Sequence, residues 1–152
     1  MNNNKKVLAC ASFGGHWIQL GRIVEGLKDD YQFVYVCSSK NGKELLHGEK
    51  MYVMKNFNRN NWWWGFWNVL IAVYVIIKEH PKAVLTTGAA PGMVCLAVGK
   101  LFGVKGIWVD TIANASCLSG SGRIARKCAD CIYTQWPDLA DEKVKYAGSV
   151  LD

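Results

Sequence analysis

Two glycines and a histidine lie where a buried strand is predicted to give way to a helix. The apolar run Lys5–Ser12 ends in Phe-Gly-Gly-His, and apolar residues then recur at helical spacing. Backbone N–H groups at a helix N-terminus bind anions, because they lack intrahelical partners and the helix dipole favours negative charge. We therefore predict that Ser12, Gly14 and Gly15 hold a phosphate or diphosphate. The alternative is a turn that needs glycine for backbone geometry alone.

His16 lies on the same turn, which makes it a candidate for chemistry. An imidazole there can hydrogen-bond a diphosphate or remove a proton from a hydroxyl, although a lone histidine is often structural. The turn is not the dinucleotide-binding fingerprint, because Ser12 and Trp17 occupy its first and third glycine positions. It is not a P-loop either, because no Gly-Lys-Ser/Thr follows.

A second glycine turn runs from Gly88 to Gly92, after the predicted strand Ala83–Thr87. It opens a predicted helix, Pro91–Phe102, with proline in the first turn, where proline is well tolerated. Small residues let a ligand approach the backbone closely. Gly88 and Gly92 are therefore candidates for a second anion-binding site.

Asp110 directly follows the predicted strand Gly106–Val109, and Asn114 and Arg123 come later in the same polar segment. In parallel sheets, ligands bind outside the carboxyl ends of the strands. Asp110 is therefore a candidate for a catalytic base or for a ligand of sugar hydroxyls. The alternative is a structural aspartate of the helix-capping kind. We predict that Asn114 and Arg123 contribute to binding the anion.

The elements that must position these residues alternate between apolar runs and helix-spaced segments. This pattern predicts an α/β fold, a single Rossmann-like domain with a parallel sheet. A chain of 152 residues with 51% hydrophobic residues is large enough for one domain with a substantial core. The predicted strands are Lys5–Ser12, Tyr31–Ser38, Lys50–Met54, Ala83–Thr87, Gly106–Val109 and Cys131–Tyr133. A basic helix is predicted at Ile124–Ala129, and Tyr146–Leu151 is a final short segment.

The formal net charge of +6 favours anionic partners such as phosphates or acidic lipid headgroups. No secretory signal is apparent, so we expect a location in the cytosol or on the cytosolic face of a membrane. Cys128-x-x-Cys131 lacks the second ligand pair of a zinc site, so we favour a role for these two cysteines in packing. We predict no metal and no cofactor. The six cysteines are predicted to be reduced interior thiols: Cys10, Cys37, Cys95, Cys117, Cys128 and Cys131.

The segment Trp62–Ile77 has no charged residue over 16 positions, which is shorter than the roughly 20 residues of a membrane-spanning helix. A core helix accounts for its aliphatic residues. Aromatic clusters beside a basic residue, here Arg59, suit the headgroup zone of a bilayer. The sequence has no repeated pattern of basic and aromatic residues that would suit a nucleic acid. We therefore predict that the protein does not bind nucleic acid. The predicted membrane-contact residues are Trp62, Trp63, Trp64, Phe66 and Trp67.

Several motifs occur together in an order that resembles one family. They are Ser12-Phe13-Gly14-Gly15-His16, Thr86-Thr87-Gly88 with the loop to Gly92, Ile107-Trp108-Val109-Asp110, Leu118 to Arg123, and Gln135-Trp136-Pro137-Asp138. The chain resembles the PssD-like polysaccharide biosynthesis proteins, which are related to the ALG-type, membrane-associated subunit of the dolichol-linked GlcNAc transferase. It is more distantly similar to the N-terminal half of MurG.

This resemblance implies the N-terminal half of a split GT-B glycosyltransferase. Residues 1–152 would form one acceptor-binding, membrane-associating domain on the cytoplasmic face of the cell membrane. A separate PssE-like chain would bind the UDP-sugar in the joint cleft. The acceptor would be a polyprenyl-diphosphate-linked saccharide in capsule or exopolysaccharide synthesis, and Tyr146–Leu151 would help to dock the partner.

Two features differ from the family. Members often have Glu-Ser where this chain has Asp110 and Thr111. The dolichol-pathway relatives have an N-terminal membrane helix, which we do not expect in this protein. Membrane attachment is therefore expected from Trp62–Ile77. Two other functions stay open at this point: a non-catalytic scaffold that recruits the partner, and a stand-alone nucleotide-binding domain.

Overall fold

The computed structural model describes residues 5–152, and these form one sheet of seven parallel strands. The strand order is β3-β2-β1-β4-β5-β6-β7, so the sheet grows in opposite directions from β1 and β4. The strands are β1 (Lys6–Ala11), β2 (Gln32–Cys37), β3 (Met51–Val53), β4 (Ala83–Gly88), β5 (Lys105–Val109), β6 (Cys131–Thr134) and β7 (Val144–Tyr146).

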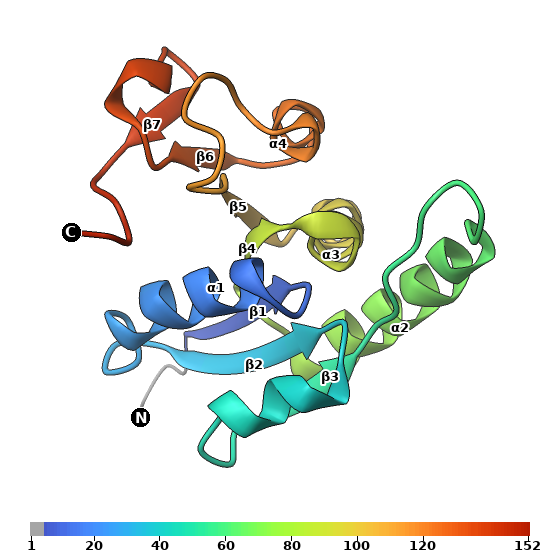
Figure 1. The fold of residues 1–152 in the computed structure, drawn as a ribbon. Coiled ribbons are helices and arrows are strands. Elements are labelled where there is room, and N and C mark those ends of the chain that lie inside the picture. The colour runs from blue at the N-terminus through green and yellow to red at the C-terminus, as the bar shows by residue number, and fades with distance from the viewer. Residues whose placement is uncertain (1–4) are drawn as a thin grey trace.

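Helices cover the two faces of the sheet unequally (Figure 1). On one face α1 packs alone, over β1 and β4. On the other face α2 and α3 pack against each other and against the sheet, with α4 beside α3. The α-helices are α1 (Gly15–Glu25), α2 (Trp63–Glu79), α3 (Ala89–Leu101) and α4 (Gly120–Ala125), and the 3-10 helices are η1 (Lys40–Leu45) and η2 (Pro137–Leu139).

The predicted α/β fold with a parallel sheet is confirmed, and some element limits are wrong. The basic helix predicted at Ile124–Ala129 is α4, which begins at Gly120 because the Ser119 hydroxyl accepts a hydrogen bond from the Gly122 backbone N–H (2.8 Å). The strand β7 was not predicted. Its three residues are too few to show an alternating pattern.

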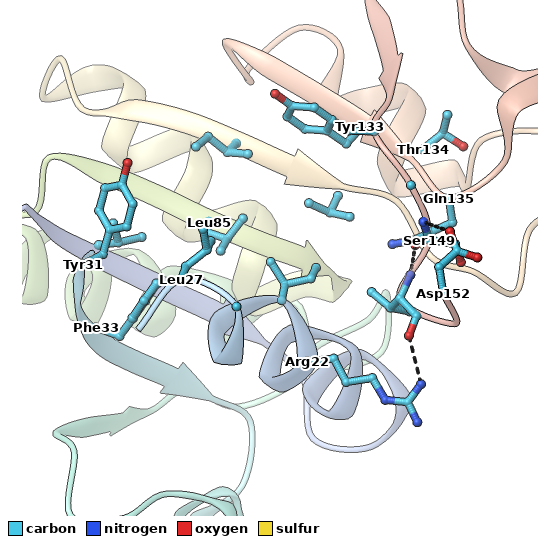
Figure 2. A pocket seen from close by; sticks show the side chains of 18 residues that line it. Arg22, Leu27, Tyr31, Phe33, Leu85, Tyr133, Thr134, Gln135, Ser149 and Asp152 are labelled. Atoms are coloured by element: carbon cyan, nitrogen blue, oxygen red, sulfur yellow. Dashed lines mark hydrogen bonds between the residues drawn. The ribbon is translucent and has the colours of Figure 1, made fainter. Parts of the chain in front are cut away.

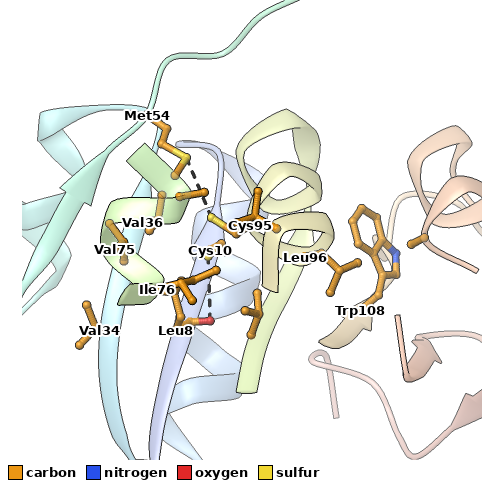
Figure 3. Packing of buried hydrophobic residues seen from close by; sticks show 14 of the residues in the cluster. Leu8, Cys10, Val34, Val36, Met54, Val75, Ile76, Cys95, Leu96 and Trp108 are labelled. Atoms are coloured by element: carbon orange, nitrogen blue, oxygen red, sulfur yellow. Dashed lines mark hydrogen bonds between the residues drawn. The ribbon is translucent and has the colours of Figure 1, made fainter. Parts of the chain in front are cut away.

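The larger core cluster lies between the sheet and the helices α2 and α3 (Figure 3). Cys10, Met54 and Cys95 bring three sulfur atoms together there, with Cys95 Sγ 4.0 Å from Met54 Sδ. The cysteines are free, as predicted, but only three of them are buried. Cys117 is exposed, so the prediction that all six lie in the interior is wrong.

Gly92 lets α3 lie close to the sheet. A Cβ built at this position would come within 1.9 Å of Thr86 Oγ1, so a larger residue would push the helix away from β4. The N-terminus of α3 is thereby held directly at the end of β4.

A carboxylate ties α2 to the opposite, amino-terminal edge of the sheet. Glu79 is 5% exposed, and it accepts hydrogen bonds from Lys6 Nζ (3.2 Å), Lys50 Nζ (2.9 Å) and Tyr52 Oη (2.5 Å). Burial by itself raises the pKa of Glu79, but the bonds from Tyr52, Lys50 and Lys6 outweigh burial and lower the pKa to about 2. The ionised carboxylate therefore links β1, β3 and α2.

Replacing Glu79 by glutamine should make the stability of the fold less dependent on pH. The folded-state pKa lies below the unfolded value of 4.5, so the contribution is present above pH 4.5 and is lost as the pH falls towards 2. Glu79→Gln should lower the free energy of unfolding by about 3 kcal/mol at pH 7 and by little at pH 2, measured by denaturant titration. Equal losses at both pH values would contradict the assigned role of the charge.

Candidate functional site

The candidate site lies where the strand order of the sheet reverses, between β1 and β4. Loops that leave these neighbouring strands pass to opposite faces, α1 on one face and α3 on the other, so both helix N-termini lie at the carboxyl edge of the sheet. Both helix N-termini begin with unusual backbone conformations. Gly14 has φ 117° and Gly88 has φ 132°, values that glycine adopts readily.

One strained residue lies at this edge. Ala89, the first residue of α3, has φ 67°, a left-handed conformation that costs an alanine roughly 1–2 kcal/mol. Strain of this kind is often found where a turn must present its backbone to a ligand. At the other turn, a Cβ on Gly14 or Gly15 would have no atom within 4 Å, so the backbone there faces open space.

His16 joins the two turns. Its Nδ1 donates a hydrogen bond to the Thr87 carbonyl oxygen (2.9 Å), and Thr87 Oγ1 donates one to the His16 carbonyl oxygen (2.7 Å). A Cβ on Gly88 would lie 3.0 Å from the imidazole ring, so glycine leaves room for it. Because a carbonyl oxygen only accepts, Nδ1 carries the proton, and Nε2 of the neutral ring presents a lone pair.

Asp110 is buried and its carboxylate is fully engaged. It is 1% exposed, Oδ1 accepts from Trp108 Nε1 (3.0 Å) and Ser119 Oγ (2.5 Å), and Oδ2 accepts from the Ser119 backbone N–H (2.8 Å). A Cβ on Gly122 would come within 2.5 Å of Oδ1, so α4 also packs closely on it. This geometry favours the structural alternative: Asp110 closes the loop between β5 and α4.

Gln19 is a site residue that the sequence analysis missed. It is buried on α1, one helical turn after Gly15, and its Nε2 donates to the Asp110 carbonyl oxygen (3.1 Å). Its Oε1 accepts from the Ile112 backbone N–H (3.4 Å). The glycine turn after β1 is thus tied to the loop after β5, across the intervening strand β4.

The remaining predicted site residues lie at different depths. Ser12 is buried at the end of β1, and Gly92 is buried on the side of α3 that packs against Thr86 of β4. Asn114 is half-buried on the loop after β5, and Arg123 is exposed on α4. The structure therefore brings Gly14, Gly15, His16 and Gly88 to one place and leaves Arg123 at the periphery.

One face of α2 is apolar and exposed along the whole helix. Trp62 is 69% exposed and Phe66 is 62% exposed. The exposed apolar face comprises Trp62, Trp63, Phe66, Trp67, Leu70, Tyr74 and Ile77. Trp64 differs because it is half-buried, with Lys55 Nζ 3.9 Å from its ring centroid.

The segment before α2 is fastened by Asn68. The buried side chain of Asn68 accepts from the Lys55 backbone N–H (3.2 Å) and donates to the Lys55 carbonyl oxygen (2.6 Å). Within residues 5–152, none of the helices has the length and apolarity needed to cross a bilayer. The same range contains no cluster of three His, Cys, Asp or Glu side chains suited to a metal ion.

Comparison with known proteins finds similar sequences among glycosyltransferase subunits. No family model matches the chain. It is 24% identical to the UDP-N-acetylglucosamine transferase subunit ALG14 of Mus musculus, over 95% of this chain and 80% of that protein. It is 34% identical to the subunit alg14 of Schizosaccharomyces pombe, over 57% of this chain and 46% of that protein.

Solved structures share the fold at lower sequence identity. The chain matches MurG from Acinetobacter baumannii with a TM-score of 0.80 and 13% identity, over 94% of this chain and 45% of MurG. It matches UDP-N-acetylglucosamine 2-epimerase from Rickettsia bellii with a TM-score of 0.75 and 14% identity, over 98% of this chain and 46% of the epimerase. The chain thus spans less than half the length of these proteins and has the Rossmann-like fold of GT-B glycosyltransferases.

Asp110→Asn tests whether Asp110 is mainly structural. An amide can accept only on its oxygen, so its NH₂ group would face at least one of the three donors that now point at the carboxylate. We expect the free energy of unfolding to fall by about 1–3 kcal/mol, measured by denaturant titration. Exposed Asp138, substituted to asparagine, is the control. Unchanged stability of Asp110→Asn would contradict the structural role.

Proposed function

We propose that this chain is the acceptor-binding subunit of a two-chain glycosyltransferase. The enzyme transfers a sugar from a UDP-sugar to a polyprenyl-diphosphate-linked saccharide, in capsule or exopolysaccharide synthesis. A PssE-like partner binds the UDP-sugar, and this chain works at the cytoplasmic face of the cell membrane. The proposal is supported by the similarity to the ALG14 subunits and above all by the two glycine turns after β1 and β4, which His16 and Thr87 join at the carboxyl edge of the sheet.

The acceptor diphosphate is proposed to lie against the turn Gly14–Gly15 and the N-terminus of α1. The backbone there faces open space, and the first N–H groups of a helix lack intrahelical partners. The net charge of +6 favours the same anion at longer range. Gly88 and the N-terminus of α3 lie on the other side of His16.

His16 is the base that the geometry favours. The Thr87 carbonyl holds the ring by Nδ1, and no hydrogen bond within residues 5–152 engages Nε2. In the proposed step, the acceptor hydroxyl oxygen forms a bond to C1 of the sugar while the bond from C1 to the UDP oxygen breaks, with inversion. The hydroxyl proton passes to His16 Nε2. Asp110 is less suited, because its carboxylate already accepts three hydrogen bonds.

The exposed face of α2 is proposed to contact the membrane. Because α2 follows β3 and leads into the amino end of β4, its Trp-rich end lies towards the carboxyl edge of the sheet, as the two glycine turns do. Tryptophan is enriched at the bilayer interface, and Lys55 and Arg59 lie just before this end. A lipid-linked acceptor held in the bilayer could then present its diphosphate to the site.

Sugar transfer measured with each chain alone and with both chains tests the proposal as a whole. Radiolabelled UDP-sugars and lipid-extracted acceptor are the substrates. Transfer that requires both chains supports it. Full transfer by the partner alone would reduce this chain to a scaffold, and UDP-sugar binding by this chain alone would favour a stand-alone nucleotide-binding domain.

His16 variants separate a base from a structural contact. His16→Ala removes both ring nitrogens, whereas His16→Asn retains an N–H for the Thr87 carbonyl but has no Nε2. If His16 is the base, both variants should lower kcat about 100-fold or more while the two chains still associate. Exposed His47, substituted to alanine, is the control. Near-normal turnover of His16→Asn would show that only the contact with Thr87 matters.

Membrane contact is tested with vesicles that contain anionic phospholipid. The double variant Phe66→Ser and Trp67→Ser should lower the vesicle partition coefficient at least about tenfold, because each buried apolar side chain of this size contributes about 1.5–3 kcal/mol. Leu101→Ser, which removes an exposed apolar residue on α3, should have little effect. Equal partitioning of the double variant and the wild type would argue against membrane contact by α2.

A further inference from the structure

Phe13 is an exposed aromatic residue within the turn that is proposed to hold the acceptor diphosphate. It is 45% exposed, and it stands between buried Ser12 and Gly14, whose backbone faces open space. Single exposed apolar residues are common, so exposure alone does not identify a binding residue. Next to an anion-binding turn, however, an exposed ring suits a ligand that carries an apolar group directly beside its anionic group.

The two sides of this turn are held to different strands. The Phe13 backbone N–H donates a hydrogen bond to Ser38 Oγ (2.7 Å), directly after β2. His16 exchanges two hydrogen bonds with Thr87 of β4 (2.9 and 2.7 Å). Because β1 lies between β2 and β4, Phe13 is held on the β2 side of the turn and His16 on the β4 side. The turn therefore has a direction across the carboxyl edge of the sheet.

Ser12 lies between these two sides, at the end of β1. Its side chain is 7% exposed, yet its hydroxyl makes no hydrogen bond within residues 5–152. In that range every fully buried polar side-chain atom has a partner, so the Ser12 hydroxyl reaches the surface. A free hydroxyl beside the open backbone of Gly14 and Gly15 can donate a hydrogen bond to a phosphate oxygen. This arrangement favours a diphosphate over the end of β1.

The proposed acceptor has an apolar chain on one phosphate and a sugar on the other. If the sugar hydroxyl gives its proton to His16 Nε2, the sugar lies on the β4 side of the turn. The prenyl chain then leaves on the β2 side, where Phe13 is held. The distance from β2 to β4 is about 10 Å, because neighbouring strands are about 4.8 Å apart. A ligand with its diphosphate over β1 can therefore reach both sides.

The Trp-rich end of α2 lies on the same side of the turn as Phe13. The strand β3 is next to β2, and residues 54–62 lead from β3 to α2 at the carboxyl edge. Val75 and Ile76 of α2 belong to the core cluster that also contains Val34 and Val36 of β2 (Figure 3). A prenyl chain that passes Phe13 would therefore run towards the surface proposed to contact the membrane.

The groove beside α1 is another apolar surface that a prenyl chain might be expected to use. It has a volume of about 960 Å³, and Leu85 of β4 and Tyr133 of β6 are part of its lining (Figure 2). It lies on the face of the sheet opposite to α2, and neither Phe13 nor His16 lines it. A chain in this groove would lie away from the proposed membrane surface, so the path past Phe13 is favoured.

We infer that Phe13 binds the part of the prenyl chain nearest to the diphosphate and thereby sets the direction of the bound acceptor. The chain extends from the end of β1 towards β2 and α2, and the saccharide lies on the side of His16. The inference rests on the proposed function, and it adds a residue that selects acceptors with a lipid directly beside the diphosphate.

Farnesyl diphosphate and inorganic diphosphate are the probes, and calorimetry on the purified chain measures the affinity for each. The wild type should bind farnesyl diphosphate more tightly, because only this probe has a prenyl chain. Phe13→Ser should weaken farnesyl diphosphate about fivefold to tenfold, since binding buries the exposed part of the ring. The affinity for inorganic diphosphate should stay the same.

Three further variants serve as controls. Phe13→Leu keeps an apolar side chain and should bind farnesyl diphosphate within about twofold of the wild type. Phe102→Ser changes a phenylalanine that is 48% exposed at the C-terminal end of α3, and it should bind both probes normally. Ile23→Ser changes the lining of the groove beside α1 and should also leave both affinities unchanged.

Sugar transfer with both chains is measured in parallel, so the inference and the proposed function can fail separately. If transfer requires both chains but Phe13→Ser binds both probes like the wild type, the inference is overturned and the function stands. Equal weakening of the two probes would show that Phe13 only supports the turn, which also overturns the inference. Weaker farnesyl diphosphate binding in Ile23→Ser alone would move the chain to the groove. If the wild type binds neither probe, the inference fails, and if sugar transfer is also absent, the function fails with it.

Discussion

The reversal of strand order between β1 and β4 is the constraint on which the candidate site depends. It sends the two following helices to opposite faces, and their N-termini lie close to each other at the carboxyl edge of the sheet. The paired hydrogen bonds between His16 and Thr87 then hold the two loops together, one bond from each residue to the backbone of the other. An imidazole is thereby fixed between two helix N-termini, an arrangement suited to a phosphorylated ligand.

A second set of contacts ties the glycine turn after β1 to the loop after β5 and fixes that loop. Gln19 ties α1 to the loop after β5, and Asp110 folds the same loop back onto Ser119 at the start of α4. Neither side chain needs to touch a ligand to matter. Their buried polar atoms are paired within the protein, so loss of either partner would leave an unsatisfied group in the interior.

The sequence predicted the sheet, the two glycine turns and the place of His16, because buried strands and glycine-rich turns leave local patterns. It did not predict Gln19, whose partners are 91 and 93 positions away, because no local pattern marks a polar residue that bridges two loops. The role of Asp110 was left open for a similar reason: its partners Trp108 and Ser119 meet it only when the loop folds back. Gly92 is a different case. The sequence correctly placed this glycine near the start of a helix, but it did not reveal that α3 needs a glycine there to pack closely on Thr86.

The clamp between Asn68 and Lys55 has a consequence for the thermodynamics of surface binding. Amphipathic segments that fold only on a bilayer lose conformational entropy when they bind, and this loss opposes adsorption. Here the segment before α2 is already fixed by two hydrogen bonds, and the helix is packed on α3. Adsorption through α2 would therefore be a rigid-body event, in which the helical content of the protein is the same in solution and on the lipid.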